Sequence, residues 1–111
     1  MAADLTAFHQ EFKADQSRLR QEMPDLIKGF GGLYQASMKE GALSVKAKEV
    51  IAVAISMALR CEPCIYLHVK KALEVGATRE ELLEAAGVVV MMQGGPGYTY
   101  LPKLLQALDE G

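Results

Sequence analysis

The sequence has no excess of positive charge and no long, uninterrupted apolar run. Its formal net charge is -2 at pH 7, with 12 Lys and Arg residues against 14 Asp and Glu residues. The basic residues are scattered among carboxylates, as on solvated helix faces, whereas a nucleic-acid footprint needs clustered Lys and Arg. The longest apolar stretches, residues 50–59 and 85–92, are broken by Ser56 and Gly87 and are too short to span a bilayer. We therefore expect neither a nucleic-acid partner nor a membrane partner.

Targeting signals and structural disulfides are also scarce. Residues 1–16 lack the basic and apolar regions of a secretory signal, so we expect a cytoplasmic protein. The chain has two cysteines, Cys61 and Cys64. Because the cytosol keeps thiols reduced, such a pair seldom forms a structural staple. In a C-x-x-C arrangement the two thiols indicate redox chemistry or metal binding instead.

No long segment of the sequence alternates apolar and polar residues, so we do not expect β-strands. The apolar spacing predicts an all-α fold of about six helices. We predict these helices at residues 4–22, from 24 to a stop at Gly41, at 45–59, from 62 or 63 to 75, at 79–93 and at 98–109. Thr78 followed by Glu81 is a capping box for the fifth of them, and the GGPG sequence at residues 94–97 predicts a turn.

Hydrophobic residues make up 50% of a chain of only 111 residues, which we interpret as one domain over residues 1–111. So short a chain leaves much of its surface unburied when it folds alone. The helix predicted at residues 45–59 is apolar almost all round, which is typical of a central, buried helix. Together these features predict a homo-oligomer.

The most informative pattern is Glu49, eleven further residues, Cys61-Glu62-Pro63-Cys64, three residues and His68. Spacings of three and four place the two cysteines and the histidine on one helix face. If the helices on either side of Arg60 form an antiparallel hairpin, Glu49 and His68 differ in axial position by only roughly 4–5 Å. The sequence therefore predicts that a carboxylate, an imidazole and two thiols converge.

Each of these residue types has a role in thiol chemistry. The thiolate is the nucleophile, so its pKa must fall below the ordinary value of about 8.5. The start of a helix offers partial positive charge to both cysteines, and His68 can accept a thiol proton. Glu49 can orient the imidazole and stabilise its charged form. We favour Cys64, beside His68, as the attacking thiol and Cys61 as the resolving one, although the helix dipole also favours Cys61.

This spacing, followed by Gly76-Ala77-Thr78, Glu81 and Gly95-Pro96, resembles the carboxymuconolactone decarboxylase superfamily, and most closely its alkylhydroperoxidase D-like branch. The resemblance covers roughly residues 43–105. It implies an all-α fold, a Cys–Cys–His–Glu proton relay and thiol-dependent peroxidase or disulfide oxidoreductase activity in a homotrimer or homohexamer. It also implies a small hydroperoxide or disulfide as substrate and a lipoyl or thioredoxin-like thiol as reductant. No organic cofactor motif is visible, and we assign no cofactor and no metal.

The sequence departs from the best-studied peroxidases of the family at Pro63, where those enzymes carry a histidine, so no relay can pass through this position. Three alternatives stay open. Cys61, Cys64, His68 and Glu49 are acceptable zinc ligands. The protein could instead be a carboxymuconolactone decarboxylase-like enzyme, or a non-catalytic oligomeric module with a metal or structural cysteine site. Tyr66 is a candidate for lining the cysteine cleft or for an oligomer contact.

Overall fold

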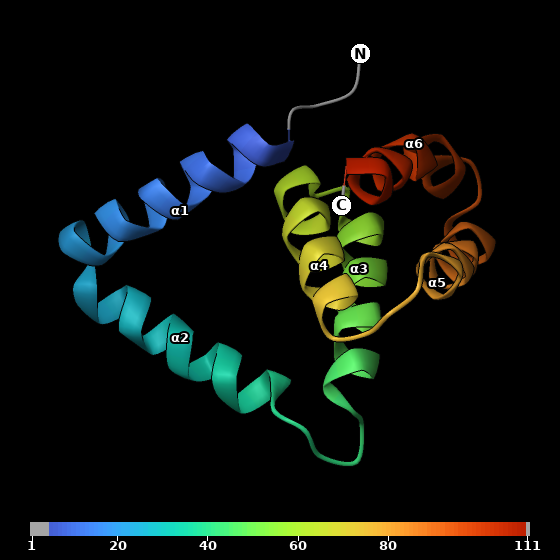
Figure 1. The fold of residues 1–111 in the computed structure, drawn as a ribbon. Helices are drawn as coiled ribbons and strands as arrows, with labels where there is room; N and C mark the ends of the chain where they lie inside the picture. The colour runs from blue at the N-terminus through green and yellow to red at the C-terminus, as the bar shows by residue number, and fades with distance from the viewer. Residues whose placement is uncertain (1–4, 111) are drawn as a thin grey trace.

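The structure is a computed structural model, and it describes residues 5–110. All its regular structure is helical (Figure 1). The six helices are α1 (Leu5–Glu22), α2 (Pro24–Met38), α3 (Val45–Leu59), α4 (Glu62–Glu74), α5 (Arg79–Gln93) and α6 (Gly95–Glu110). The all-α prediction is confirmed, and within residues 5–110 there is no strand.

Helices α3 to α6 form the packed body of the molecule. α3 is central and packs against α4, α5 and α6, while α4 also packs against α6 (Figure 1). The fully buried side chains come from all four of these helices, and the largest of them are Met57, Ile65, Leu82, Leu104, Val53 and Val69. This body holds α3 and α4 rigidly beside each other.

The turn between α3 and α4 falls where the sequence places it. Arg60 ends α3 in the left-handed conformation, with φ of 57°, and its N–H donates to the carbonyls of Ser56 and Met57. Cys61 then caps α4, and Pro63 lies in the first turn of that helix, where its missing N–H costs nothing. The predicted hairpin about Arg60 is therefore present.

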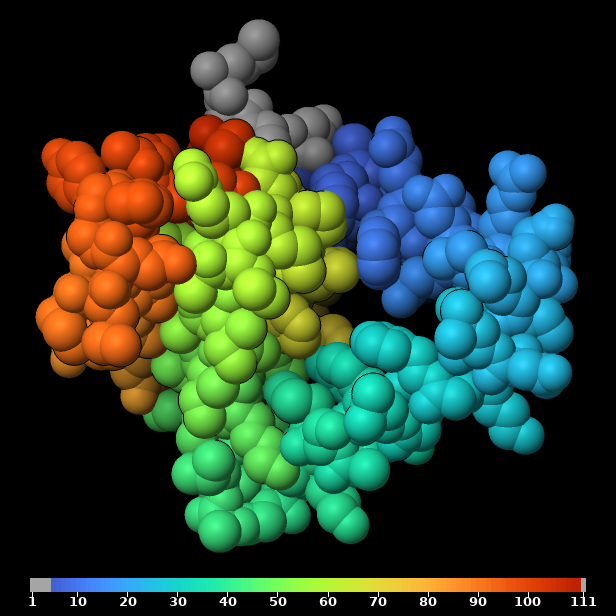
Figure 2. Space-filling view, turned by 180° about the vertical axis from the view of Figure 1, so that it is seen from behind, coloured from blue at the N-terminus to red at the C-terminus, as the bar shows by residue number. Residues whose placement is uncertain are grey.

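Helices α1 and α2 form an arm that stands away from the body. They meet at Met23, and no residue of α2 is buried. α1 touches α6, and α2 touches α3, so the arm and α4 face each other across an opening (Figure 1). The space-filling view from behind shows this opening as a hollow between the α1–α2 arm and the body (Figure 2).

Three details differ from the predictions. α2 ends at Met38 and not at Gly41, because Lys39 already takes an extended conformation, with φ of -67° and ψ of 155°. α6 begins at Gly95 rather than at Tyr98, because Gly94 alone turns the chain, with φ of 71°, and Pro96 is tolerated in the first helical turn. α3 is central but not buried all round, since Ile51, Ile55 and Leu59 are 44%, 52% and 71% exposed. The neighbouring helices α4, α5 and α6 cover only part of the circumference of α3, so one face of this apolar helix stays exposed within a single chain.

Candidate active site

The two cysteines lie at the start of α4 and are joined by a disulfide, with their Cα atoms 5.2 Å apart. The Sγ of Cys61 also accepts a hydrogen bond from the backbone N–H of Cys64, at 3.2 Å. The C-x-x-C spacing permits this bond because Cys61 is the capping residue, just outside the helix, while Cys64 is in its first turn. The structure therefore represents the oxidised form of the pair.

Glu49 of α3 and His68 of α4 are in direct contact, as the hairpin geometry predicts. The Nδ1 atom of His68 lies 2.8 Å from Oε1 of Glu49, and Glu49 is only 4% exposed. An ionised carboxylate can only accept hydrogen bonds, so this contact places a proton on Nδ1. In the neutral imidazole, Nε2 then carries the lone pair and is free to act as a base.

Two further side chains join this pair, and sequence reasoning had not identified either. The hydroxyl of Tyr34 on α2 donates to Oε2 of Glu49 at 3.2 Å, and the Nζ of Lys71 donates to the same hydroxyl at 2.8 Å. The Lys71 ammonium lies 4.2 Å from the centre of the Tyr34 ring, which is nearly parallel to the ring of His68. Both carboxylate oxygens of Glu49 are thus occupied.

The sequence contains a signal for the position of Lys71 but none for that of Tyr34. Lys71 is three positions after His68, a spacing that places it on the same face of α4, so its proximity could have been read from the sequence. Tyr34 is 15 positions before Glu49 and reads only as an apolar position in α2. Its contact depends on where the arm lies, which no local pattern reveals.

A pocket of about 950 Å³, which we call the thiol pocket, lies between the arm and α4. From α4 it is lined by Cys64, Leu67, His68 and Lys71. Cys61 does not line it. In the disulfide form, His68 has no hydrogen bond to either sulfur among the described residues, but it shares the wall of the thiol pocket with Cys64.

Tyr66 lies elsewhere, and neither of the two roles considered for it fits. Its side chain is 6% exposed and packs edge-on against Phe8, on the side of α4 that faces α1 and α6. Burial, followed by the nearby charge of Glu62, raises the pKa of its hydroxyl. The residue is a core tyrosine, because its position in α4 directs it away from the thiol pocket.

Within residues 5–110, no three side chains of His, Cys, Asp or Glu are grouped so that they could hold a metal ion. None of the described helices is both long and apolar enough to cross a membrane.

Comparison with known proteins identifies relatives over almost the whole chain. A structure of a carboxymuconolactone decarboxylase family protein from Legionella pneumophila has a TM-score of 0.90 and 40% identity, covering 96% of this chain and 95% of the other. A Thermotoga maritima family protein, for which an involvement in the antioxidative response has been suggested, has a TM-score of 0.77 and 26% identity over 97% of this chain and 89% of that protein. An uncharacterised protein of Cupriavidus necator is 35% identical over 98% of this chain and 96% of its own length.

The model of the carboxymuconolactone decarboxylase family matches residues 24–107, which include the whole cysteine, histidine and glutamate constellation. The fold, the constellation and the sequence relatives agree. The chain belongs to the carboxymuconolactone decarboxylase family, as a short member of the alkylhydroperoxidase D-like type.

Proposed function

We propose that this protein is a thiol-dependent peroxidase or disulfide oxidoreductase in which Cys64 attacks and Cys61 resolves. The observation that carries the proposal is that Cys64 lines the thiol pocket together with His68, while Cys61 lies outside it. Of the two cysteines, only Cys64 borders the space that a substrate would occupy. The antioxidative role suggested for the Thermotoga maritima protein is compatible with the same chemistry.

The steps with a hydroperoxide are balanced as follows. The Cys64 thiolate attacks the terminal peroxide oxygen, the O–O bond breaks, and an alcohol leaves after taking up one proton, so that Cys64 becomes a sulfenic acid. The Cys61 thiol then attacks the Cys64 sulfur, forming the disulfide and releasing water. A dithiol supplies two electrons and two protons by exchange, becomes a disulfide itself and restores both thiols. With a disulfide substrate, the first step forms a mixed disulfide instead.

His68 and Glu49 supply the proton handling. Nε2 of His68, left basic by the contact between Nδ1 and Glu49, accepts the Cys64 proton and returns it to the leaving alkoxide. Buried Glu49 stabilises the imidazolium that forms in between. Pro63 takes no part in this route, so the histidine that other peroxidases carry at this position is not needed for it.

The proposal is tested with reduced protein and cumene hydroperoxide. Wild type loses both thiols, and dithiothreitol restores them. Cys61→Ser protein accumulates a sulfenic acid on Cys64 that dimedone traps, whereas Cys64→Ser protein accumulates none. Trapping on Cys61 of the Cys64→Ser variant would reverse the order of attack. If neither hydroperoxides nor small disulfides oxidise the wild-type pair, the proposed function is wrong.

The electron donor is proposed by class, as a lipoyl group or a thioredoxin-like protein. Turnover with dihydrolipoamide is compared with turnover with a reduced thioredoxin, each at equal thiol concentration.

Lactone decarboxylation is a second candidate function, because the family is named after this reaction. The consumption of a carboxymuconolactone by the Cys61→Ser, Cys64→Ser double variant is followed by ultraviolet absorbance. This assay separates decarboxylation from thiol chemistry, since only decarboxylation survives without the thiols. Stoichiometric zinc that protects both thiols would instead support a metal module.

A further inference from the structure

We propose that the thiol pocket binds an amphipathic carboxylate, namely a long-chain hydroperoxide whose acid group lies against Arg20 and Lys28 while its peroxide reaches Cys64. This inference rests on the proposed function and names the substrate class of the same site. It follows from three properties of the pocket: its charge, the placement of that charge, and its size.

The charge of the pocket differs from that of the whole chain. Its charged lining residues are Arg20, Lys28 and Lys71, and no Asp or Glu lines it, although the chain carries a net charge of -2. Within residues 5–110, neither Arg20 nor Lys28 has an ion-pair partner, whereas Lys46 and Lys103 are paired with carboxylates elsewhere. Unpaired cations beside an apolar pocket attract an anionic ligand and exclude a cationic one.

The positive charges that are free for a ligand lie opposite the sulfur. Arg20 is near the end of α1 and Lys28 near the start of α2, so both are close to the junction of the two arm helices. This junction lies away from α4, the helix that carries Cys64 (Figure 1). Lys71, on α4 itself, is already engaged by the Tyr34 hydroxyl. A ligand carboxylate at the arm therefore stays away from the thiolate, whose formation a nearby anion would oppose.

Much of the remaining lining is apolar. Phe12 of α1, Ile27 and Phe30 of α2 and Leu67 of α4 line the pocket, together with the uncharged polar side chains of Gln16 and Gln35. Its volume of about 950 Å³ is at the upper end of the range for small-molecule sites, ~300–1,000 Å³. Hydrogen peroxide needs none of this space, whereas a long hydrocarbon chain removes its apolar surface from water there.

The first experiment compares the hydroperoxide of an 18-carbon unsaturated fatty acid with its methyl ester, both below their critical micelle concentrations. We expect kcat/KM for the acid to exceed that for the ester by about tenfold at low salt, and the difference to shrink as salt screens the charges. In the Arg20→Gln, Lys28→Gln double variant the ratio of acid to ester falls toward one. The matched control, Lys13→Gln with Lys39→Gln, removes two cations that do not line the pocket and keeps the wild-type ratio.

The second experiment fills the pocket. A Cβ atom added at Gly31 or at Gly29 has no atom within 4 Å, and only Gly31 lines the pocket. Gly31→Leu should lower kcat/KM for the long acid relative to that for hydrogen peroxide by tenfold or more, and Gly29→Leu should leave this ratio as in wild type. Equal ratios in the two variants would overturn the pocket assignment.

A binding measurement on the disulfide form separates failure of this inference from failure of the proposed function. Parinaric acid, a fluorescent fatty acid, should bind, and the double Gln variant should weaken its binding severalfold. If it binds in this way but no peroxide oxidises the thiols, the anion pocket stands and the peroxidase proposal falls. If peroxides oxidise Cys64 while acid and ester react equally and parinaric acid does not bind, the pocket inference is wrong and the peroxidase proposal stands.

Discussion

Glu49 is the residue on which the site depends most. A buried carboxylate is costly unless hydrogen bonds satisfy it. Here Tyr34 and His68 contact its two oxygens from α2 and α4, at 3.2 Å and 2.8 Å. A residue held from two sides also fixes the imidazole that it contacts, which is what a proton relay requires.

The relay makes a specific prediction for the reduced protein. His68→Gln removes the base and should move the pH profile of iodoacetamide alkylation of Cys64 to higher pH, because the thiolate loses its proton acceptor and charged partner. Glu49→Gln should give a smaller shift in the same direction, since it removes only the group that stabilises imidazolium. The double variant should shift less than the sum of the single shifts, because the two residues act as a unit. Superimposable profiles would show that the start of α4 alone tunes the thiols.

Tyr34 gives a second prediction at this scale. Tyr34→Phe removes the hydroxyl between Lys71 and Glu49 and should lower the free energy of unfolding by about 1.5–3 kcal/mol, the usual value of a hydrogen bond to a charged group. It should also shift the alkylation profile of Cys64, because Glu49 loses one of its two partners. Tyr98→Phe is the control, since Tyr98 is exposed and its hydroxyl makes no hydrogen bond with the described residues. Urea unfolding and alkylation are measured on both. A stability loss without an alkylation shift would limit Tyr34 to a structural role.

At the scale of the elements, the contact between α5 and α6 depends on a glycine. A Cβ atom at Gly97 would lie 3.0 Å from the Cα of Val90 and 3.3 Å from the carbonyl oxygen of Val89. These are backbone atoms of α5 and cannot turn aside. The close approach explains why the first turn of α6 has a glycine at this position.

We therefore expect Gly97→Ala to lower the free energy of unfolding by about 1–3 kcal/mol, as overpacking commonly does. Gly95→Ala is the matched control, because a Cβ atom there has no neighbour within 4 Å. It should leave stability unchanged or raise it slightly, since alanine favours a helix more than glycine does. Urea unfolding followed by circular dichroism measures both. Equal stabilities would mean that α6 can shift on α5 without cost.

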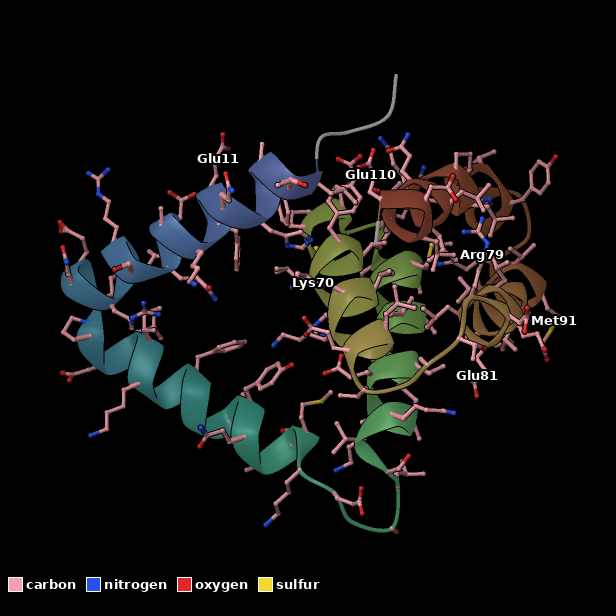
Figure 3. The ribbon with its side chains drawn as sticks, in the orientation of Figure 1. Glu11, Lys70, Arg79, Glu81, Met91 and Glu110 are labelled. Carbon is pink, nitrogen blue, oxygen red and sulfur yellow. A yellow bond between two sulfur atoms is a disulfide. The ribbon has the colours of Figure 1, made fainter. Side chains whose placement is uncertain are left out.

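At the scale of the whole molecule, two neighbouring helices expose apolar side chains together. Ile51, Ile55 and Leu59 of α3 are exposed, and so are three residues of α5, Val88, Met91 and Met92. Met91, 71% exposed, points outward from α5 (Figure 3). Exposed patches of this kind commonly mark protein interfaces. They support the proposal of a homotrimer or homohexamer.

Light scattering at micromolar concentration should accordingly give a mass three or six times that of the 12.1 kDa chain. Ile55→Lys should shift the population to smaller species, because it places a charge in the proposed contact. Val75→Lys, a similar change outside the α3 and α5 surface, should leave the mass unchanged. A well-folded wild-type monomer would contradict the proposal.

The positions of many helix ends are determined by residues close to them in the sequence. The start of α3 follows from Ser44, the break after α3 from Pro63, and the start of α5 from the Thr78 capping box, each of which acts within one helical turn. The single domain over residues 1–111 stays a prediction. The hairpin also needed only local information, because a short turn fixes the register of two helices and so brings Glu49 opposite His68.

What the sequence by itself determined, then, was the set of helices and the contact between Glu49 and His68 across one hairpin. Only the tertiary structure decided that Tyr34 joins this pair and connects it to Lys71, that Cys64 rather than Cys61 faces a pocket, and that Tyr66 turns away from it. The physical reason is distance along the chain. Capping and periodicity act over three or four residues, whereas the position of the α1–α2 arm depends on packing between segments that no local pattern relates.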